Sequence, residues 1–103
     1  MKIYNKLIRD NIPEITKKNG QTAYISVLDD EGYTAELRKK LVEETQEYLD
    51  SEEPEELADI IEVIEALAGT KGKTLDEILE IKQRKAIKNG KFEKRLFLEK
   101  VKD

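Results

Sequence analysis

The segment LVEETQEYLDSEEPEELADIIEVIEALAG, residues 41–69, decides the fold because it contains two helical patterns separated by a break. The run SEEP at residues 51–54 interrupts both patterns, and proline is favoured in the first turn of a helix. We therefore expect one helix over residues 34–51 and a second over residues 54–68. A connection this short makes consecutive helices lie antiparallel and side by side.

The second expected helix has an unusually broad apolar surface. Nine of the fifteen residues between Pro54 and Ala68 are apolar, whereas a surface helix carries a narrower apolar stripe. Only Glu62 and Glu65 look obliged to face water. Such a helix is either central in a bundle or buried against another subunit. We therefore expect a homodimer or a homotetramer.

The segments on either side of the hairpin complete the expected fold. Asp10 can cap a short helix over residues 11–18, and a third long helix is expected over residues 75–88, with Thr74 and Glu77 spaced as a capping box. Residues Thr22–Leu28 and Arg95–Val101 alternate between apolar and polar side chains. We expect a mainly α protein, an antiparallel helical bundle, to which these last two segments could add a small two-stranded β element.

Composition limits the chemistry that the chain can perform. The 103 residues fit a single domain over residues 1–103. The sequence has no Cys and no His, so acid–base or metal chemistry must use carboxylates, Lys, Tyr or water. The net charge of −4 argues against general nucleic-acid binding. Neither a signal pattern nor a run of transmembrane length is present, so we expect a cytoplasmic protein without a membrane partner.

Four carboxylates are expected to meet on the hairpin. Glu44 and Glu47 share one face of the first helix, and Glu56 and Asp59 share one face of the second, because both pairs are spaced i, i+3. Residues that lie opposite each other in an antiparallel hairpin have residue numbers with a constant sum. This sum is the same for Glu47 with Glu56 as for Glu44 with Asp59, so both pairs are expected to face each other across the hairpin. Four adjacent carboxylates need a counter-charge, which a hard divalent cation with oxygen ligands supplies.

A simpler interpretation of these glutamates must be weighed beside the metal site. Most glutamates on helices are solvated, and an ExxE pattern alone has almost no specificity. Pairing of Glu44 with Lys40 and of Glu43 with Lys39, both at i, i+4 spacing, would make ordinary surface ion pairs. The equal hairpin register of two acidic pairs is what favours a site.

The acidic pattern also resembles a known group of proteins. Glu43, Glu44 and Glu47, followed by Glu56 and Asp59 on the next helix, resemble the motifs of the all-α nucleotide pyrophosphohydrolases. That superfamily includes MazG, phosphoribosyl-ATP pyrophosphohydrolase and the dimeric dUTPases. The resemblance implies a single MazG-like domain that binds Mg²⁺, with Mn²⁺ as an alternative, through Glu44, Glu47, Glu56 and Asp59.

Two further segments resemble one branch of that superfamily, the short phosphoribosyl-ATP pyrophosphohydrolase-like proteins. These are YNKLIRD with IPEI near the start, and Lys85 with Gly90 and FEKR at residues 92–95. Asn11 departs from the branch, which often has Lys there, and Asn89 and Lys91 replace parts of an Arg-Gly-Gly-like turn. These departures affect the expected substrate contacts more than the metal site.

The resemblance implies a reaction, in which a nucleoside triphosphate or related nucleotide is hydrolysed to the monophosphate and pyrophosphate in a house-cleaning role. Glu43 or Glu47 would accept the proton of the attacking water. Seven basic residues lie between positions 82 and 95 and could hold phosphate charge, although each could equally belong to a solvated basic face. The candidate substrate-binding residues are Lys85, Arg95, Lys6 and Arg9.

Two other functions remain open at this level. The chain could be a non-catalytic helical module that binds nucleotides or regulates a partner, having kept the acidic hairpin without turnover. The basic tail could alternatively contact nucleic acid, a reading that the acidic net charge disfavours.

Overall fold

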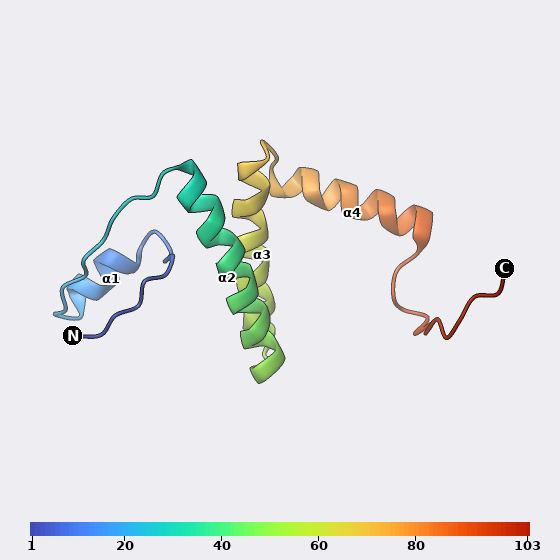
Figure 1. Ribbon diagram of the computed structural model, residues 1–103, viewed down its shortest axis with the longest axis horizontal. Helices are drawn as coiled ribbons and strands as arrows, with labels where there is room; N and C mark the ends of the chain where they lie inside the picture. The colour runs from blue at the N-terminus through green and yellow to red at the C-terminus, as the bar shows by residue number, and fades with distance from the viewer.

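Four α-helices make up the regular structure of the computed structural model, which describes all 103 residues (Figure 1). They are α1 (Ile12–Lys18), α2 (Asp30–Ser51), α3 (Pro54–Thr70) and α4 (Leu75–Asn89). The prediction of a mainly α protein is therefore confirmed, and each expected helix is present with ends shifted by a few residues. None of these helices is long and apolar enough to cross a membrane.

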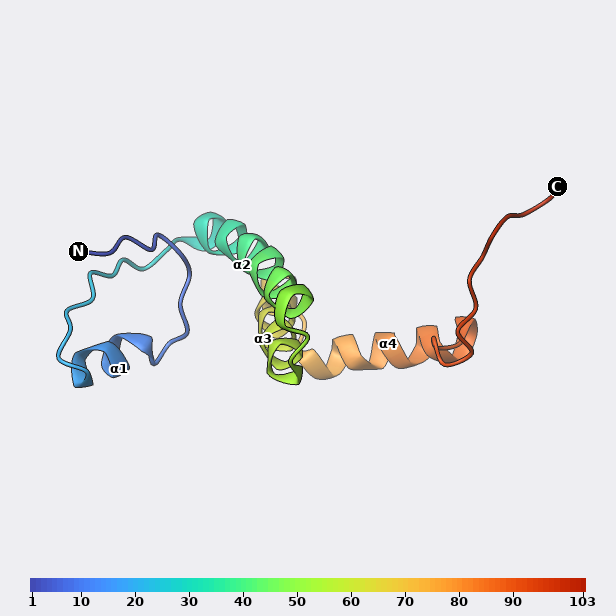
Figure 2. The same ribbon diagram turned by 90° about the horizontal axis from the view of Figure 1, so that it is seen from below.

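The centre of the molecule is an antiparallel hairpin of α2 and α3 (Figures 1 and 2). Glu52 ends α2 in the left-handed conformation, with φ of 58°, and its N–H donates to the Tyr48 carbonyl at 2.7 Å. Pro54 then occupies the first turn of α3, where its missing N–H costs no hydrogen bond. The break predicted at residues 51–54 is thus confirmed.

Helix α2 begins four residues earlier than expected, because Asp30, Glu31 and Gly32 form part of its first turn. Asp29 is its N-cap, and the Asp29 carboxylate accepts a hydrogen bond from the Gly32 N–H at 2.8 Å. An aspartate that starts a turn and one that caps a helix have the same local signal, so the sequence pattern alone could not separate the two.

Little of the chain is buried. Leu37 of α2 and Val63 of α3 form the centre of the hairpin, with exposed fractions of 3% and 7%. The other two buried residues are Ala68 and Glu44. A single chain therefore contains a two-helix hairpin rather than the complete bundle that we expected.

Helix α4 leaves the hairpin as an arm (Figures 1 and 2). It contacts α3 and no other helix. Its start is the predicted capping box, in which the Thr74 hydroxyl accepts from the Glu77 N–H while the Glu77 carboxylate accepts from the Thr74 N–H. The local signal therefore placed the start of α4 correctly, whereas its direction is set by the turn that follows α3.

The expected two-stranded β element is absent. Thr22–Leu28 and Arg95–Val101 are irregular, and they lie toward opposite ends of the chain in both views (Figures 1 and 2). Their separation prevents any ladder of hydrogen bonds, without which an isolated strand has no stabilising partner. Apolar side chains of both segments are consequently exposed, including Val27 at 97% and Phe97 at 87%.

Candidate metal centre

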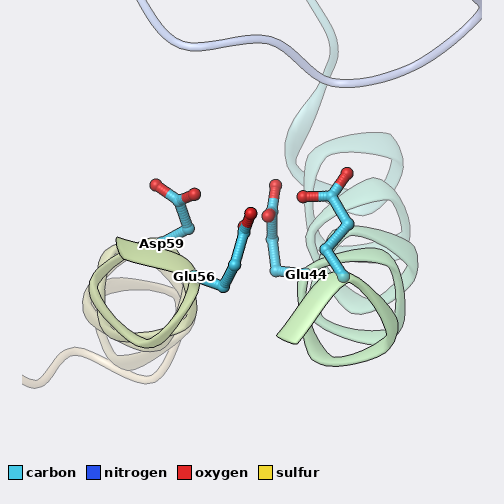
Figure 3. Close-up of side chains that lie close together, drawn as sticks. Glu44, Glu56 and Asp59 are labelled. Atoms are coloured by element: carbon cyan, nitrogen blue, oxygen red, sulfur yellow. The ribbon is translucent and has the colours of Figure 1, made fainter. Parts of the chain in front are cut away.

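Four carboxylates from the hairpin converge on one site. One oxygen from each of Glu44, Glu47, Glu56 and Asp59 lies within 4.8 Å of the corresponding oxygen of the others. Glu44, Glu56 and Asp59 project toward the same side of the helix pair (Figure 3). The predicted hairpin register is therefore confirmed, and two helices place two carboxylates each.

The spacing of these oxygens suits a shared cation. Ligand oxygens on opposite sides of Mg²⁺ are about 4.2 Å apart, and those around Ca²⁺ are somewhat further apart. Oxygens within 4.8 Å of one another can consequently contact one ion after small adjustments of the side chains. The chain offers no nitrogen or sulfur ligand from His or Cys, so a hard cation fits the donor set best.

Glu44 is the least accessible member of the cluster. Its exposed fraction is 8%, and Oε2 is buried without a hydrogen-bond partner. Burial raises the pKa of Glu44, and the neighbouring Glu47 raises it further, while Lys40 opposes both. An unpartnered buried carboxylate oxygen destabilises the fold, and a bound cation would satisfy it.

The carboxyl group of Glu56 also has a raised pKa. Burial raises the pKa of its carboxyl group, and the negative charge of Asp59 raises it further. Two of the four carboxylates are therefore held above their usual pKa, as expected where acidic groups share a site without a full counter-charge.

The N-terminal segment places two basic residues beside the cluster. The Arg9 guanidinium donates to Asp59 Oδ1 at 2.7 Å and lies 3.8 Å from Glu62 Oε1. Lys6 Nζ donates to Glu43 Oε1 at 3.4 Å. The backbone of this segment passes over the carboxylates (Figure 3). Of the predicted substrate-binding residues, Arg9 thus contacts a predicted metal ligand and Lys6 contacts the neighbouring Glu43.

Glu43 lies next to the cluster rather than in it. Burial would raise the pKa of its carboxyl group, but the positive charges and hydrogen bonds of Lys40 and Lys6 outweigh burial and lower it. Lys40 Nζ is 3.4 Å from both Glu43 Oε1 and Glu44 Oε1. Glu43 therefore remains ionised at neutral pH.

Lys40 is the basic residue that the sequence suggested only as an ordinary surface partner of Glu44, whereas in the structure it lies 3.4 Å from both Glu43 and Glu44. Its i, i+4 spacing from Glu44 was the available signal, and the Lys40–Glu44 pair is present. The expected Lys39–Glu43 pair is wrong, because Lys39 instead lies 2.9 Å from Glu36. Lys40 is largely covered, with 17% of its side chain exposed, so its charge acts on both glutamates with reduced screening by water.

The other two candidate substrate-binding residues are not brought to the cluster within one chain. Lys85 is exposed on α4, which departs from the end of α3 opposite the carboxylates (Figure 1). Arg95 follows in the exposed C-terminal segment. No salt bridge joins either residue to the four carboxylates.

Comparisons with known proteins add no assignment: no family model, no curated protein and no solved structure matches the chain.

Proposed function

We propose that the chain is a magnesium-dependent nucleotide pyrophosphohydrolase of the all-α, MazG-like kind, most similar to the phosphoribosyl-ATP pyrophosphohydrolase-like branch. Two observations carry the metal site: four carboxylate oxygens lie within 4.8 Å of one another, and Oε2 of Glu44 is buried without a hydrogen-bond partner. The resemblance of the acidic motifs supplies the reaction. The substrate is a ribo- or deoxyribonucleoside triphosphate or a related nucleotide, and the products are the monophosphate and pyrophosphate.

The cation would be held by Glu44, Glu47, Glu56 and Asp59. Bound there, Mg²⁺ or Mn²⁺ would supply a Lewis acid for phosphate oxygens and would make water more acidic. In the proposed reaction a water oxygen attacks the α-phosphorus, the bond to the bridging oxygen of the β-phosphate breaks, and pyrophosphate leaves with that oxygen.

A carboxylate of the chain accepts the proton of the attacking water. Glu43 is one candidate, because its lowered pKa keeps it ionised beside the cluster. Glu47 is the other, since it is the exposed member of the four and can meet water directly. In either case the base is a carboxylate, which is consistent with the absence of His and Cys from the chain.

Arg9 and Lys6 hold the substrate phosphates in this proposal. Both are bonded to carboxylates here, Arg9 to Asp59 and Lys6 to Glu43. If Asp59 were to bind a cation, it would no longer need Arg9 for neutralisation, and the Arg9 guanidinium could then donate to a substrate phosphate. Arginine suits that role because its planar fork can donate two parallel hydrogen bonds.

The decisive assay measures pyrophosphate release from a panel of nucleoside and deoxynucleoside triphosphates with Mg²⁺ and with Mn²⁺. We expect Glu44→Gln and Asp59→Asn each to reduce the rate by about 100-fold or more, because each removes a charged ligand. Glu65→Gln is the matched control, since Glu65 is an exposed acid of α3 outside the cluster. Activity that survives both ligand substitutions contradicts the proposal.

A second candidate is a non-catalytic module that binds nucleotides or regulates a partner through the same hairpin. It is favoured by one observation, namely that α4, which contains Lys85, and the C-terminal segment, which contains Arg95, extend away from the hairpin in a single chain (Figure 1). Calorimetry separates the two functions: metal-dependent nucleotide binding without pyrophosphate release supports the module.

A further inference from the structure

One aromatic ring of the chain lies among basic side chains, and it belongs to Tyr4. The ammonium groups of Lys2 and Lys6 lie over this ring, 5.1 and 5.8 Å from its centroid. None of the other tyrosine and phenylalanine rings has a basic group over it. Tyr4 is 61% exposed, so its ring is not part of the hairpin core. Core packing therefore does not explain the position of this ring.

Lys6 connects the ring to the candidate metal centre. The ammonium group that lies over the Tyr4 ring also donates to Glu43 Oε1 at 3.4 Å. Glu43 directly precedes the buried ligand candidate Glu44 on α2. A single ammonium group therefore separates the ring from the edge of the carboxylate cluster.

The backbone that carries the ring is fixed on the hairpin. It turns at Asn5, whose φ of 45° lies in the left-handed region that asparagine adopts more readily than most residues. After this turn Leu7 and Ile8 are half-buried, and Arg9 donates to Asp59 at 2.7 Å. The ring of Tyr4 thus precedes by a few residues a segment that is bonded to the cluster, which limits its distance from the carboxylates.

A nucleotide needs a contact for its base as well as contacts for its phosphates. Every base has a π face, so an aromatic side chain can stack on any of them. This stacking is stronger than an exposed cation–π pair. A base can therefore replace an ammonium group over the Tyr4 ring, and the released ammonium can donate to a phosphate instead.

We propose that the ring of Tyr4 is the surface on which the base of the substrate nucleotide stacks, while Lys6 and Arg9 contact its phosphates. The inference rests on the proposed function and adds the contact for the base. Because stacking uses the π face and not the hydrogen-bonding edge, this contact accepts every common base. It distinguishes a nucleotide from an inorganic phosphate chain.

Isothermal titration of the full chain in Mg²⁺ with two ligands tests the inference. One ligand is α,β-methylene-ATP, whose α–β linkage resists hydrolysis, and the other is inorganic tripolyphosphate, which has no base. We expect Tyr4→Ala to weaken binding of the nucleotide analogue about 10-fold and to leave binding of tripolyphosphate unchanged. Tyr4→Phe keeps the ring and should bind both ligands as the wild type does.

Tyr24→Ala is the matched control, because Tyr24 is 83% exposed and has no basic group over its ring. Circular dichroism verifies that all variants stay helical. Unchanged binding of the analogue by Tyr4→Ala, or an equal loss for both ligands, overturns the inference and leaves the proposed function standing. An equal loss in Tyr4→Phe and Tyr4→Ala also overturns it, since the hydroxyl would then make the contact. A wild type that binds neither ligand contradicts the proposed function and the inference together.

Discussion

Arg9 donates to Asp59 at 2.7 Å across 50 residues of sequence, and this pair fastens the N-terminal segment over the four carboxylates. The bond has two consequences. It supplies the cluster with positive charge, and it holds beside Asp59 the guanidinium that we propose binds a substrate phosphate. The proposed cation would therefore compete with the guanidinium of Arg9 for the carboxylate of Asp59.

Replacement of Arg9 by Ala should strengthen binding of Mg²⁺ alone. Because Arg9 is 56% exposed, its ion pair is screened, and the expected gain is about two- to fivefold in affinity. Isothermal titration with MgCl₂ measures it, with Arg84→Ala on α4 as the control. The same variant should bind nucleotide more weakly. Weaker metal binding by Arg9→Ala would show that Arg9 supports the cation rather than competing with it.

Replacement of Glu44 by Gln should raise thermal stability in metal-free buffer at neutral pH. The pKa of Glu44 is raised by burial, so the ionised group destabilises the fold, and the neutral amide removes that cost. Mg²⁺ should raise the Tm of the wild type more than the Tm of Glu44→Gln. Differential scanning calorimetry with and without Mg²⁺ measures both effects. An equal Mg²⁺-dependent rise in the two proteins contradicts the role of Glu44.

Replacement of Leu37 by Ala tests the hairpin core. Leu37 is 3% exposed, and truncation of such a residue costs about 2–5 kcal/mol. The matched substitution Val42→Ala, at a position 70% exposed, should change the free energy of unfolding by less than about 0.5 kcal/mol. Urea unfolding compares the two variants at one protein concentration. Equal losses at both positions would mean that Leu37 is not the centre of the core.

Glu77 should stabilise the fold at neutral pH and lose this effect in acid. The Thr74 N–H donates to its carboxylate, which lowers its pKa from the ordinary value of 4.5. A lowered pKa in the folded state gives stability that is present above 4.5 and lost as the pH falls through the lowered value. The Tm difference between wild type and Glu77→Gln should therefore shrink from pH 7 toward pH 3. A difference independent of pH contradicts the capping box as its source.

The sequence was sufficient to predict the hairpin because the deciding signals are local. Pro54 marks the break, and the spacing of Glu44 with Glu47 and of Glu56 with Asp59 follows from helical geometry. A short connection leaves one register, so the meeting of the four carboxylates could be predicted without any distant contact.

The remaining features depend on contacts that no local pattern specifies. The exposed state of Val27 and Phe97 follows from the separation of their segments, although both segments alternate as strands do. The pairing of Arg9 with Asp59 could not be read from the sequence, since 50 residues separate them. The position of Lys85 depends on the direction in which α4 leaves the hairpin.

The central claim is that the four carboxylates hold one divalent cation, and titration with Mn²⁺ followed by electron paramagnetic resonance tests it most directly. The prediction is saturable binding of about one ion per chain, displaced by excess Mg²⁺ and reduced at least about tenfold in affinity by Glu44→Gln and by Asp59→Asn, with Glu65→Gln unaffected. Binding that is unsaturable, or that persists unchanged in both ligand variants, would contradict the claim.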